Sequence, residues 1–118
     1  MKPLEAFDRY DMIFFGQASF VGVSALGDSG DEDEFVEFSV EGIWKGLVQR
    51  RLRVHTTEGD PLCAYRFTLG KRYLVYARLE SISFSNRYRT SACARTTEAS
   101  RALPDLAILG PPHSRLEE

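Results

Sequence analysis

The longest apolar run of this chain extends from Met12 to Leu26 and reads MIFFGQASFVGVSAL. It is shorter than the roughly 18 residues that a membrane-spanning helix needs, and Gly16, Gln17, Ser19 and Gly22 interrupt it. Its β-branched and aromatic residues favour a strand, in which glycines mark bends or bulges. The run therefore predicts one long, strongly coiled β-strand and no transmembrane segment.

Four shorter segments complete the predicted set of strands. From apolar alternation and turn residues, they are expected over 35–44, 51–56, 73–79 and 88–94. Gly70-Lys71 marks the turn before the fourth strand, and SFSNR at 83–87 reads as a hairpin tip before the fifth. Five strands predict a mainly β fold, a closed Greek-key barrel of the oligonucleotide/oligosaccharide-binding (OB) type. A β-sandwich would need about seven strands.

Helices are predicted on both sides of the strands. The segment from Pro3 to Tyr10 reads as a short N-terminal helix, because proline suits the first helical turn. A second helical pattern runs from Thr96 to Gly110 and ends at this glycine. The sequence thus predicts one domain over residues 1–110, with a C-terminal helix packed on the barrel and a flexible tail at 111–118.

The C-terminal helix carries several specific expectations. Thr96 or Thr97 can cap its start, and Pro104 should kink it or divide it into two short helices. One apolar stripe is expected to face the barrel, formed by Ala99, Ala102, Leu103, Leu106 and Leu109.

Charge is distributed unevenly along the chain, although its net value is only −2. Residues 1–41 carry two basic and ten acidic side chains (−8), whereas residues 42–101 carry twelve basic and four acidic ones (+8). The basic segment could form a nucleic-acid surface. Alternatively, acidic and basic strands lie side by side and their cross-strand pairs cancel much of the field. We favour the second interpretation, because the whole domain is not basic.

No catalytic or metal-binding motif occurs in the sequence. His55 and His113 lack a cysteine or carboxylate at metal-ligand spacing, and no CxxC, HExxH or phosphate-loop pattern is present. The acidic run 31–34 lacks the spacing of a calcium loop, so a solvated face is expected. Nothing indicates a base that would activate Cys63 as a nucleophile. The sequence therefore predicts a protein that is not an enzyme and uses no cofactor or metal.

Cys63 and Cys93 are the two cysteines of the chain. They could be reduced thiols in the core, or they could form a disulfide, which would imply an oxidising compartment. Cys63 precedes the fourth predicted strand and Cys93 lies near the end of the fifth. A bridge requires that their α-carbons lie within about 7 Å. The sequence leaves both possibilities open.

A group of short motifs resembles the netrin-module superfamily, and more closely the bacterial relatives of the tissue inhibitors of metalloproteinases. In chain order they are Phe14-Phe15-Gly16, Trp44-Lys45-Gly46, CAYRF at 63–67, GKRYLVYA at 70–77, CART at 93–96 and DLAILG at 105–110. The resemblance covers roughly Glu5 to Gly110 and implies the same five-stranded barrel with helices packed against it. It also implies a non-enzymatic, exported domain that binds proteins.

The same resemblance implies a mode of inhibition. Family members begin with Cys-x-Cys, whose two cysteines bridge to the positions of Cys63 and Cys93. The amino group and carbonyl of the first cysteine chelate the catalytic zinc of the protease, where an open coordination position accepts them. Here Met1-Lys2-Pro3 stands in that place. Cys63 and Cys93 therefore lack their family partners.

From these observations we predict a monomeric, extracellular, periplasmic or cell-surface domain, although no secretory leader precedes Met1 in this sequence. A zinc metalloproteinase is one possible protein partner. The predicted contact residues are Met1, Lys2, Pro3, Asp60, Pro61, Leu62, Cys63, Ala64 and Tyr65. The acidic segment 27–34 could flank this surface.

The alternative is a barrel that binds single-stranded nucleic acid or an oligosaccharide. Its aromatic platforms would be Tyr65, Phe67, Tyr73, Tyr76, Phe84 and Tyr88, beside Arg66, Arg72, Arg87 and Arg89. Core packing explains most of these aromatic residues equally well, so no nucleic-acid partner is expected.

Overall fold

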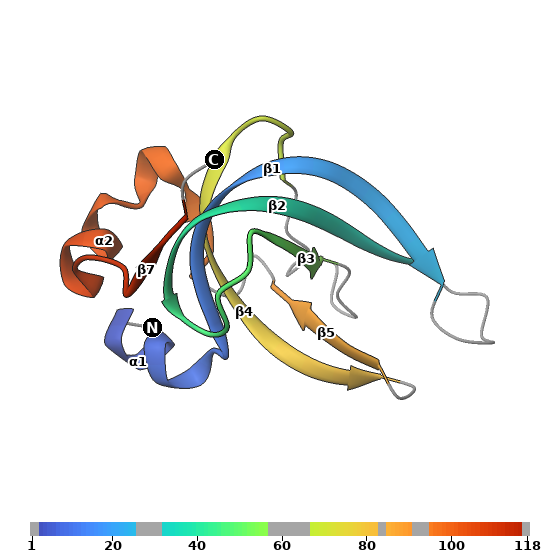
Figure 1. Cartoon of the computed structure of the whole chain (residues 1–118), viewed down its shortest axis with the longest axis horizontal. Coiled ribbons are helices and arrows are strands. Elements are labelled where there is room, and N and C mark those ends of the chain that lie inside the picture. Colours follow the sequence, from blue (N-terminus) through green and yellow to red (C-terminus); the bar gives the residue numbers. More distant parts are fainter. Residues whose placement is uncertain (1–2, 26–31, 57–66, 83–84, 91–94, 117–118) are drawn as a thin grey trace.

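The structure is a computed structural model that describes residues 3–25, 32–56, 67–82, 85–90 and 95–116 (Figure 1). Its principal elements, in chain order, are α1 (Pro3–Arg9), β1 (Met12–Ala25), β2 (Glu32–Lys45), β3 (Arg51–His55), β4 (Arg72–Ile82), β5 (Ser85–Arg89) and α2 (Leu103–Leu109). Three short elements complete the chain: β6 (Thr97–Glu98), the 3-10 helix η3 (Ala99–Arg101) and β7 (Ser114–Arg115).

Five strands close into a barrel in the order β1-β2-β3-β5-β4, and β4 pairs back onto β1. All of these pairings are antiparallel except β3 with β5, which is parallel. The two α-helices and β7 lie together at one side of the barrel (Figure 1). The predicted fold class, a small OB-type barrel with two short helices, is therefore confirmed.

Strand β1 is long and bent, and it pairs with both β2 and β4 in the barrel wall. Its register against β2 shifts after Ile13, after Phe15 and after Ala18, and each shift adds local twist. At Gly16 an added Cβ would lie 2.7 Å from the carbonyl oxygen of Ser39. The predicted bend at Gly16 thus coincides with a bulge and a close backbone approach.

Two apolar cores lie on opposite sides of β1 and β4. The inner core fills the barrel, and its largest fully buried side chains include Phe14, Phe38 and Tyr73. The outer core lies beneath the helices and includes Ile13, Leu74 and Tyr76 with Ala6, Tyr10 and Ala102. Because successive strand residues point to opposite faces, β1 and β4 supply both cores and are apolar without interruption over residues 12–15 and 73–77.

Several predicted boundaries differ from the structure. Strand β2 begins at Glu32 rather than at residue 35, so three acidic residues that we expected in a loop are paired with β1. Strand β5 covers 85–89 rather than 88–94, and the predicted hairpin tip at 83–87 is partly strand. The sequence of β5, SNRYR, is polar and shows no alternation of apolar and polar residues. The ladder with β4 (Leu79↔Tyr88, Glu80↔Arg87) sets its position.

The C-terminal segment divides into two helices, η3 and α2, as Pro104 predicted, and α2 ends at Gly110. The predicted threonine cap is wrong, because Thr97 belongs to β6 and the residue that precedes η3 is Glu98. Leu103 is 73% exposed, whereas Asp105 is buried. The face turned to the barrel is therefore formed by Ala102, Asp105, Leu106 and Leu109.

The segment after α2 also contacts the barrel. Ser114–Arg115 forms β7, which pairs with Gly42 and Ile43 of β2. The indole N–H of Trp44 donates to the carbonyl oxygen of Gly110 at 2.8 Å. Part of the segment that we expected to be a flexible tail thus belongs to the sheet.

Candidate functional site

Most of the predicted contact surface lies outside the described residues. Pro3 is described and begins α1. The other eight predicted contact residues, Met1, Lys2, Asp60, Pro61, Leu62, Cys63, Ala64 and Tyr65, lie outside, and so does Cys93. The described surroundings of the site are the residues that flank the segment 57–66, which we call the contact loop, and those that flank the segment 91–94.

The contact loop begins at a fixed point of the barrel wall. Thr56, the last described residue before it, is 5% exposed. Its backbone N–H donates to the carbonyl oxygen of Glu34 at 2.9 Å, which continues the β2–β3 ladder by one residue. The loop thus departs from an ordered strand end rather than from a surface turn.

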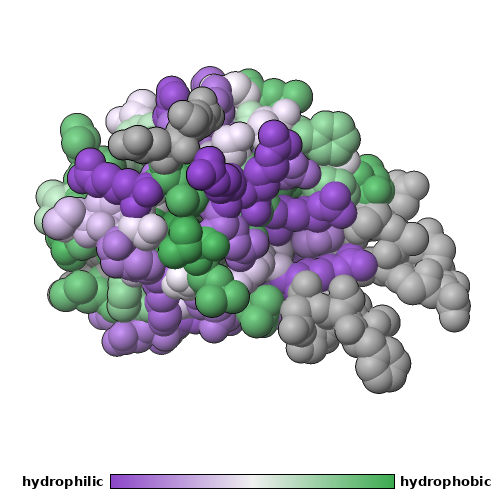
Figure 2. Space-filling model, viewed as in Figure 1, coloured by the Kyte–Doolittle hydropathy of each residue, from purple (hydrophilic) through white to green (hydrophobic). Residues whose placement is uncertain are grey.

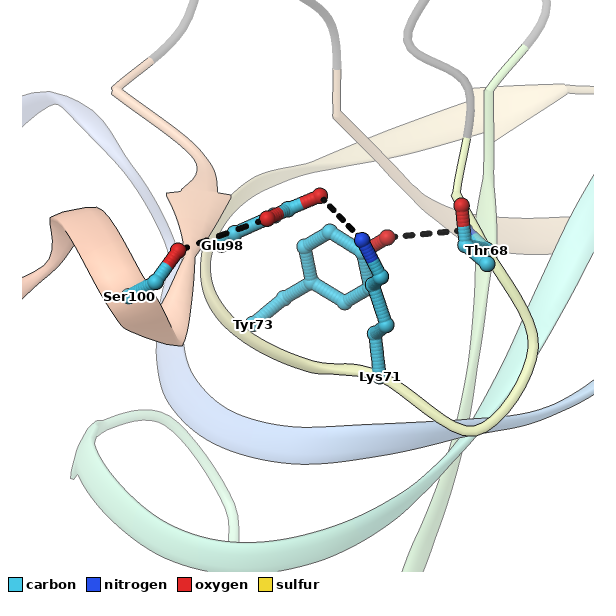
Figure 3. A network of polar contacts seen from close by, with 5 residues as sticks. All are labelled: Thr68, Lys71, Tyr73, Glu98 and Ser100. Carbon is cyan, nitrogen blue, oxygen red and sulfur yellow. Dashed lines mark hydrogen bonds and ion pairs between the residues drawn. The ribbon is translucent and has the colours of Figure 1, made fainter.

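The contact loop ends at a second fixed point, where Phe67 inserts its ring into the inner core. The ring centroid lies 4.7 Å from that of Tyr73 and 5.1 Å from that of Phe38, both edge-to-face. The backbone N–H of Thr68 donates to the hydroxyl of Tyr73 at 2.7 Å (Figure 3). Edge-to-face aromatic contacts are worth about 0.5–1.5 kcal/mol beyond area burial, so this end is held firmly.

The turn after Phe67 is bonded to β1. Gly70 has φ +87, a conformation that L side chains rarely adopt. Its N–H donates to the carbonyl oxygen of Ala18 at 2.8 Å, and the N–H of Ala18 donates to the carbonyl oxygen of Lys71. The side-chain amide of Gln17 donates to the carbonyl oxygen of Gly70. The predicted turn at Gly70-Lys71 is confirmed, and hydrogen bonds to Gln17 and Ala18 of β1 hold it in place.

The same turn is linked to the segment that follows Cys93. Lys71 Nζ lies 3.3 Å from Glu98 Oε1, and Ser100 donates to the other carboxylate oxygen of Glu98 (Figure 3). Glu98 also pairs with Tyr73 in the β4–β6 ladder. The described residues that follow the two cysteine-containing segments therefore meet beside Tyr73.

A buried threonine pair fixes both ends of segment 91–94. Thr90 Oγ1 donates to the carbonyl oxygen of Tyr76 at 2.7 Å, and the N–H of Tyr76 donates to Thr96 Oγ1 at 2.9 Å. The two hydroxyls are 2.6 Å apart. Thr90 and Thr96, which flank this segment, are therefore both bonded to the backbone of β4 at Tyr76.

Asp105 forms a buried polar cluster with Tyr76 and Arg95. Asp105 Oδ2 accepts from the Tyr76 hydroxyl at 2.8 Å and from Arg95 Nε at 2.7 Å, while Arg95 Nη2 donates to Oδ1. Burial alone would raise the pKa of Asp105, but the hydrogen bonds from Arg95 and Tyr76 and the charge of Arg95 outweigh it and lower that pKa. Burial and the hydrogen bond to Asp105 raise the pKa of Tyr76.

This cluster is structural rather than catalytic in its geometry, because its three polar groups satisfy one another between β4 and α2. The sequence analysis missed it. An aspartate directly after Pro104 signals the first turn of a helix, but its burial depends on where the helix docks.

The N-terminal helix and the end of the contact loop lie at different ends of the β1–β4 ladder. Residue Met12, which follows α1, pairs with Ala77, whereas Gln17 pairs with Arg72 beside the turn at Gly70. Figure 1 shows α1 at the lower left and the segment 67–70 at the top of the view. Pro3 is therefore placed on the helix-covered side of the barrel.

Acidic and basic strands do lie side by side. Glu37 faces Arg53 across the β2–β3 ladder and forms an ion pair with Arg51 at 3.4 Å. Glu41 pairs with Arg72 at 3.0 Å. Glu80 and Arg89, which pair at 2.7 Å, both belong to the basic segment. The favoured interpretation of the charge asymmetry is confirmed for these strands.

The aromatic residues proposed as stacking platforms are mostly core residues. Tyr73 and Tyr76 are fully buried, and Phe67 and Tyr88 pack against the inner core. Tyr65 and Phe84 lie outside the described residues. Two of the four described rings are therefore core side chains, and the other two are half-buried against the core.

A pocket of about 220 Å³ lies between the outer face of the barrel and α2. It is lined by Phe15, Glu41, Gly42, Trp44, Leu106, Pro112 and Arg115. Arg72 Nε lies 3.0 Å from each carboxylate oxygen of Glu41.

The described residues contain no group of three or more His, Cys, Asp or Glu side chains placed to hold a metal ion. No described helix has the length and apolar character needed to cross a membrane.

The fold and these contacts define a small OB-type barrel whose wall anchors the described residues on both sides of segment 57–66. No protein-family model matches the chain, and no curated protein matches it.

Proposed function

We propose that this chain is a non-enzymatic protein-binding domain that presents the contact loop 57–66 to its partner. One observation carries this proposal: both flanks of the loop are anchored in the barrel, through Thr56 on one side and through Phe67, Thr68 and Gly70 on the other. Loops on rigid scaffolds are where binding residues concentrate.

Anchored flanks favour binding for a physical reason. A partner must pay for ordering any mobile group that it contacts, at about 0.5–1.5 kcal/mol per side chain. Holding the ends of a loop on ordered strands lowers that cost. The anchors at Phe67 and Gly70 consist of core packing and backbone hydrogen bonds, which do not depend on the partner.

The resemblance to the netrin-module superfamily suggests a zinc metalloproteinase as partner. No Cys-x-Cys, the motif that chelates zinc in the inhibitors, occurs within the 118 residues, and α1 packs on the same side of the barrel as α2 (Figure 1). We therefore propose that contact is made through Asp60–Tyr65, with an N-terminal contribution that is smaller than in the inhibitors.

This proposal is tested by measuring inhibition and binding of a panel of purified zinc metalloproteinases. The test variant replaces residues 60–65 with a Gly/Ser segment of equal length, and the control replaces the exposed residues Leu47 and Val48. We expect the loop variant to weaken binding of a responding protease at least about tenfold, or about 1.4 kcal/mol, while the control binds normally. Failure of all panel members to bind, or equal binding by the loop variant, would contradict the proposal.

One observation favours a second candidate, a single-stranded nucleic-acid binder. The guanidinium of Arg53 lies 3.8 Å from the ring centroid of Phe35, and Phe20 beside it is 54% exposed. However, Glu37 and Glu80 neutralise neighbouring arginines. We expect titration with labelled single-stranded DNA at about 50 and 200 mM salt to give no salt-dependent binding tighter than about 100 µM. Tighter binding that weakens with salt would establish this candidate instead.

A further inference from the structure

Residues 19–25 of β1 form a sheet edge that no described strand covers. The β1–β4 ladder ends at Gln17, and the turn at Gly70–Lys71 bonds to Ala18. Beyond that point β1 pairs with β2 alone. We call residues 19–25 the open edge; Figure 1 shows this part of β1 extending away from the helices.

The open edge lacks the features that normally protect an edge strand. Its sequence, SFVGVSA, contains no charged residue and no proline, although charges and prolines are the usual protection against edge-to-edge pairing. Phe20, Val21 and Val23 are 54%, 45% and 54% exposed. Hydrophobic side chains gather on the part of the surface that follows β1, whereas hydrophilic ones dominate much of the same view (Figure 2).

We propose that the open edge is a self-association site, at which β1 pairs antiparallel with β1 of a second copy of this chain. A two-fold axis through Gly22 would place each residue opposite its symmetry equivalent: Val21 opposite Val23, and Phe20 opposite Ser24. Identical strands fit such an isologous contact without any other complementary surface. This inference goes beyond the proposed function, because it uses β1 rather than the contact loop.

Side-chain complementarity supports this register. Val21 and Val23 lie on one face of the strand and would form two apolar cross-strand pairs, each worth about 0.2–1 kcal/mol. On the other face, the ring of Phe35 lies directly over Gly22, and an added Cβ would lie 2.4 Å from that ring. The strand therefore presents the apolar side chains of Val21 and Val23 on one face. At the symmetry axis it has Gly22, which the ring of Phe35 covers on the other face.

Charge favours the antiparallel arrangement over a parallel one. The chain that continues from β1 into β2 carries five acidic residues between positions 28 and 34. A parallel pair would put these two acidic segments side by side, whereas an antiparallel pair places them at opposite ends.

The contact is small, so the association should be weak and reversible. Seven paired residues bury less than the roughly 1,200 Å² of a standard interface. The weight-average mass of the full chain, measured by analytical ultracentrifugation between about 10 µM and 1 mM, should rise from 13.4 kDa toward twice that value. A mass that stays at 13.4 kDa over this whole range would overturn the proposal.

Charge-swapped variants test the register directly. Both V21K/V23K and V21E/V23E place like charges opposite each other in a homodimer, so each should remain a monomer when alone. Their equimolar mixture places Lys opposite Glu and should regain dimers, which also shows that both variants are folded. L47K/V48K changes exposed residues outside the edge and should associate as the wild type does. Unchanged dimerisation of V21K/V23K, or no recovery in the mixture, would refute the antiparallel pairing.

Discussion

Replacing Phe38 by alanine is expected to lower the free energy of unfolding by about 3–5 kcal/mol. Phe38 is fully buried in the inner core, and its ring contacts those of Phe14, Phe67 and Tyr73 at centroid distances of 5.3, 5.1 and 6.3 Å. The substitution removes the transfer free energy of the ring and leaves a cavity that these rigid neighbours fill only in part. Urea unfolding followed by tryptophan fluorescence measures the effect.

The matched control is Phe20→Ala, which removes the same ring from the same sheet. Because Phe20 is 54% exposed, this change should cost less than about 1 kcal/mol. Phe38→Ala should also increase the hydrogen exchange of the Thr68 and Gly70 amides, since the Phe67 anchor loses its neighbour. Equal costs for the two variants would show that the barrel core is not packed as described.

Replacing Asp105 by alanine is expected to cost about 2–4 kcal/mol at pH 7. Asp105 is 4% exposed and accepts hydrogen bonds from Tyr76 and Arg95. Removing one partner of a buried ion pair costs about 3–5 kcal/mol, and the partial exposure of Arg95 lowers that figure, because water can solvate the guanidinium. Glu41→Ala, which breaks the exposed pair with Arg72, should cost less than about 1 kcal/mol. A loss at Asp105 no greater than that at Glu41 would disprove the role of the cluster.

The cluster of Asp105, Tyr76 and Arg95 also makes the free energy of unfolding depend on pH. The folded-state pKa of Asp105 is lowered, so its contribution to stability is present above the unfolded value of about 3.9 and is lost as the pH falls below it. The folded-state pKa of Tyr76 is raised, so its contribution is present below about pH 10 and declines above that value. Asp105→Asn keeps the shape of the side chain but cannot titrate. It should therefore flatten the loss of stability between about pH 4 and pH 2, as measured by urea unfolding at each pH.

The contact surface could be predicted only as a segment of the sequence. The motifs around Cys63 and Cys93 carried the prediction of which stretches contact a partner. The anchors of those stretches could not be predicted, because their partners lie far away in the chain. Thr56 is hydrogen-bonded to Glu34, Thr96 is hydrogen-bonded to Tyr76, and the ring of Phe67 packs against that of Phe38. Lys71 and Glu98, 27 positions apart, meet only because β6 pairs with β4.

By itself the sequence determined that five strands close into a barrel and that the last helix is divided, whereas the short strands β6 and β7 were not predicted. Period-two alternation in β2 and β3 identifies the face that must be buried, and Pro104 and Gly110 act through local backbone geometry. The tertiary structure alone decided the start of β5, the exposure of Leu103 and the burial of Asp105. In each case the local pattern was weak or ambiguous, and a contact with a distant element, β4 for the strand and the barrel wall for α2, selected the outcome.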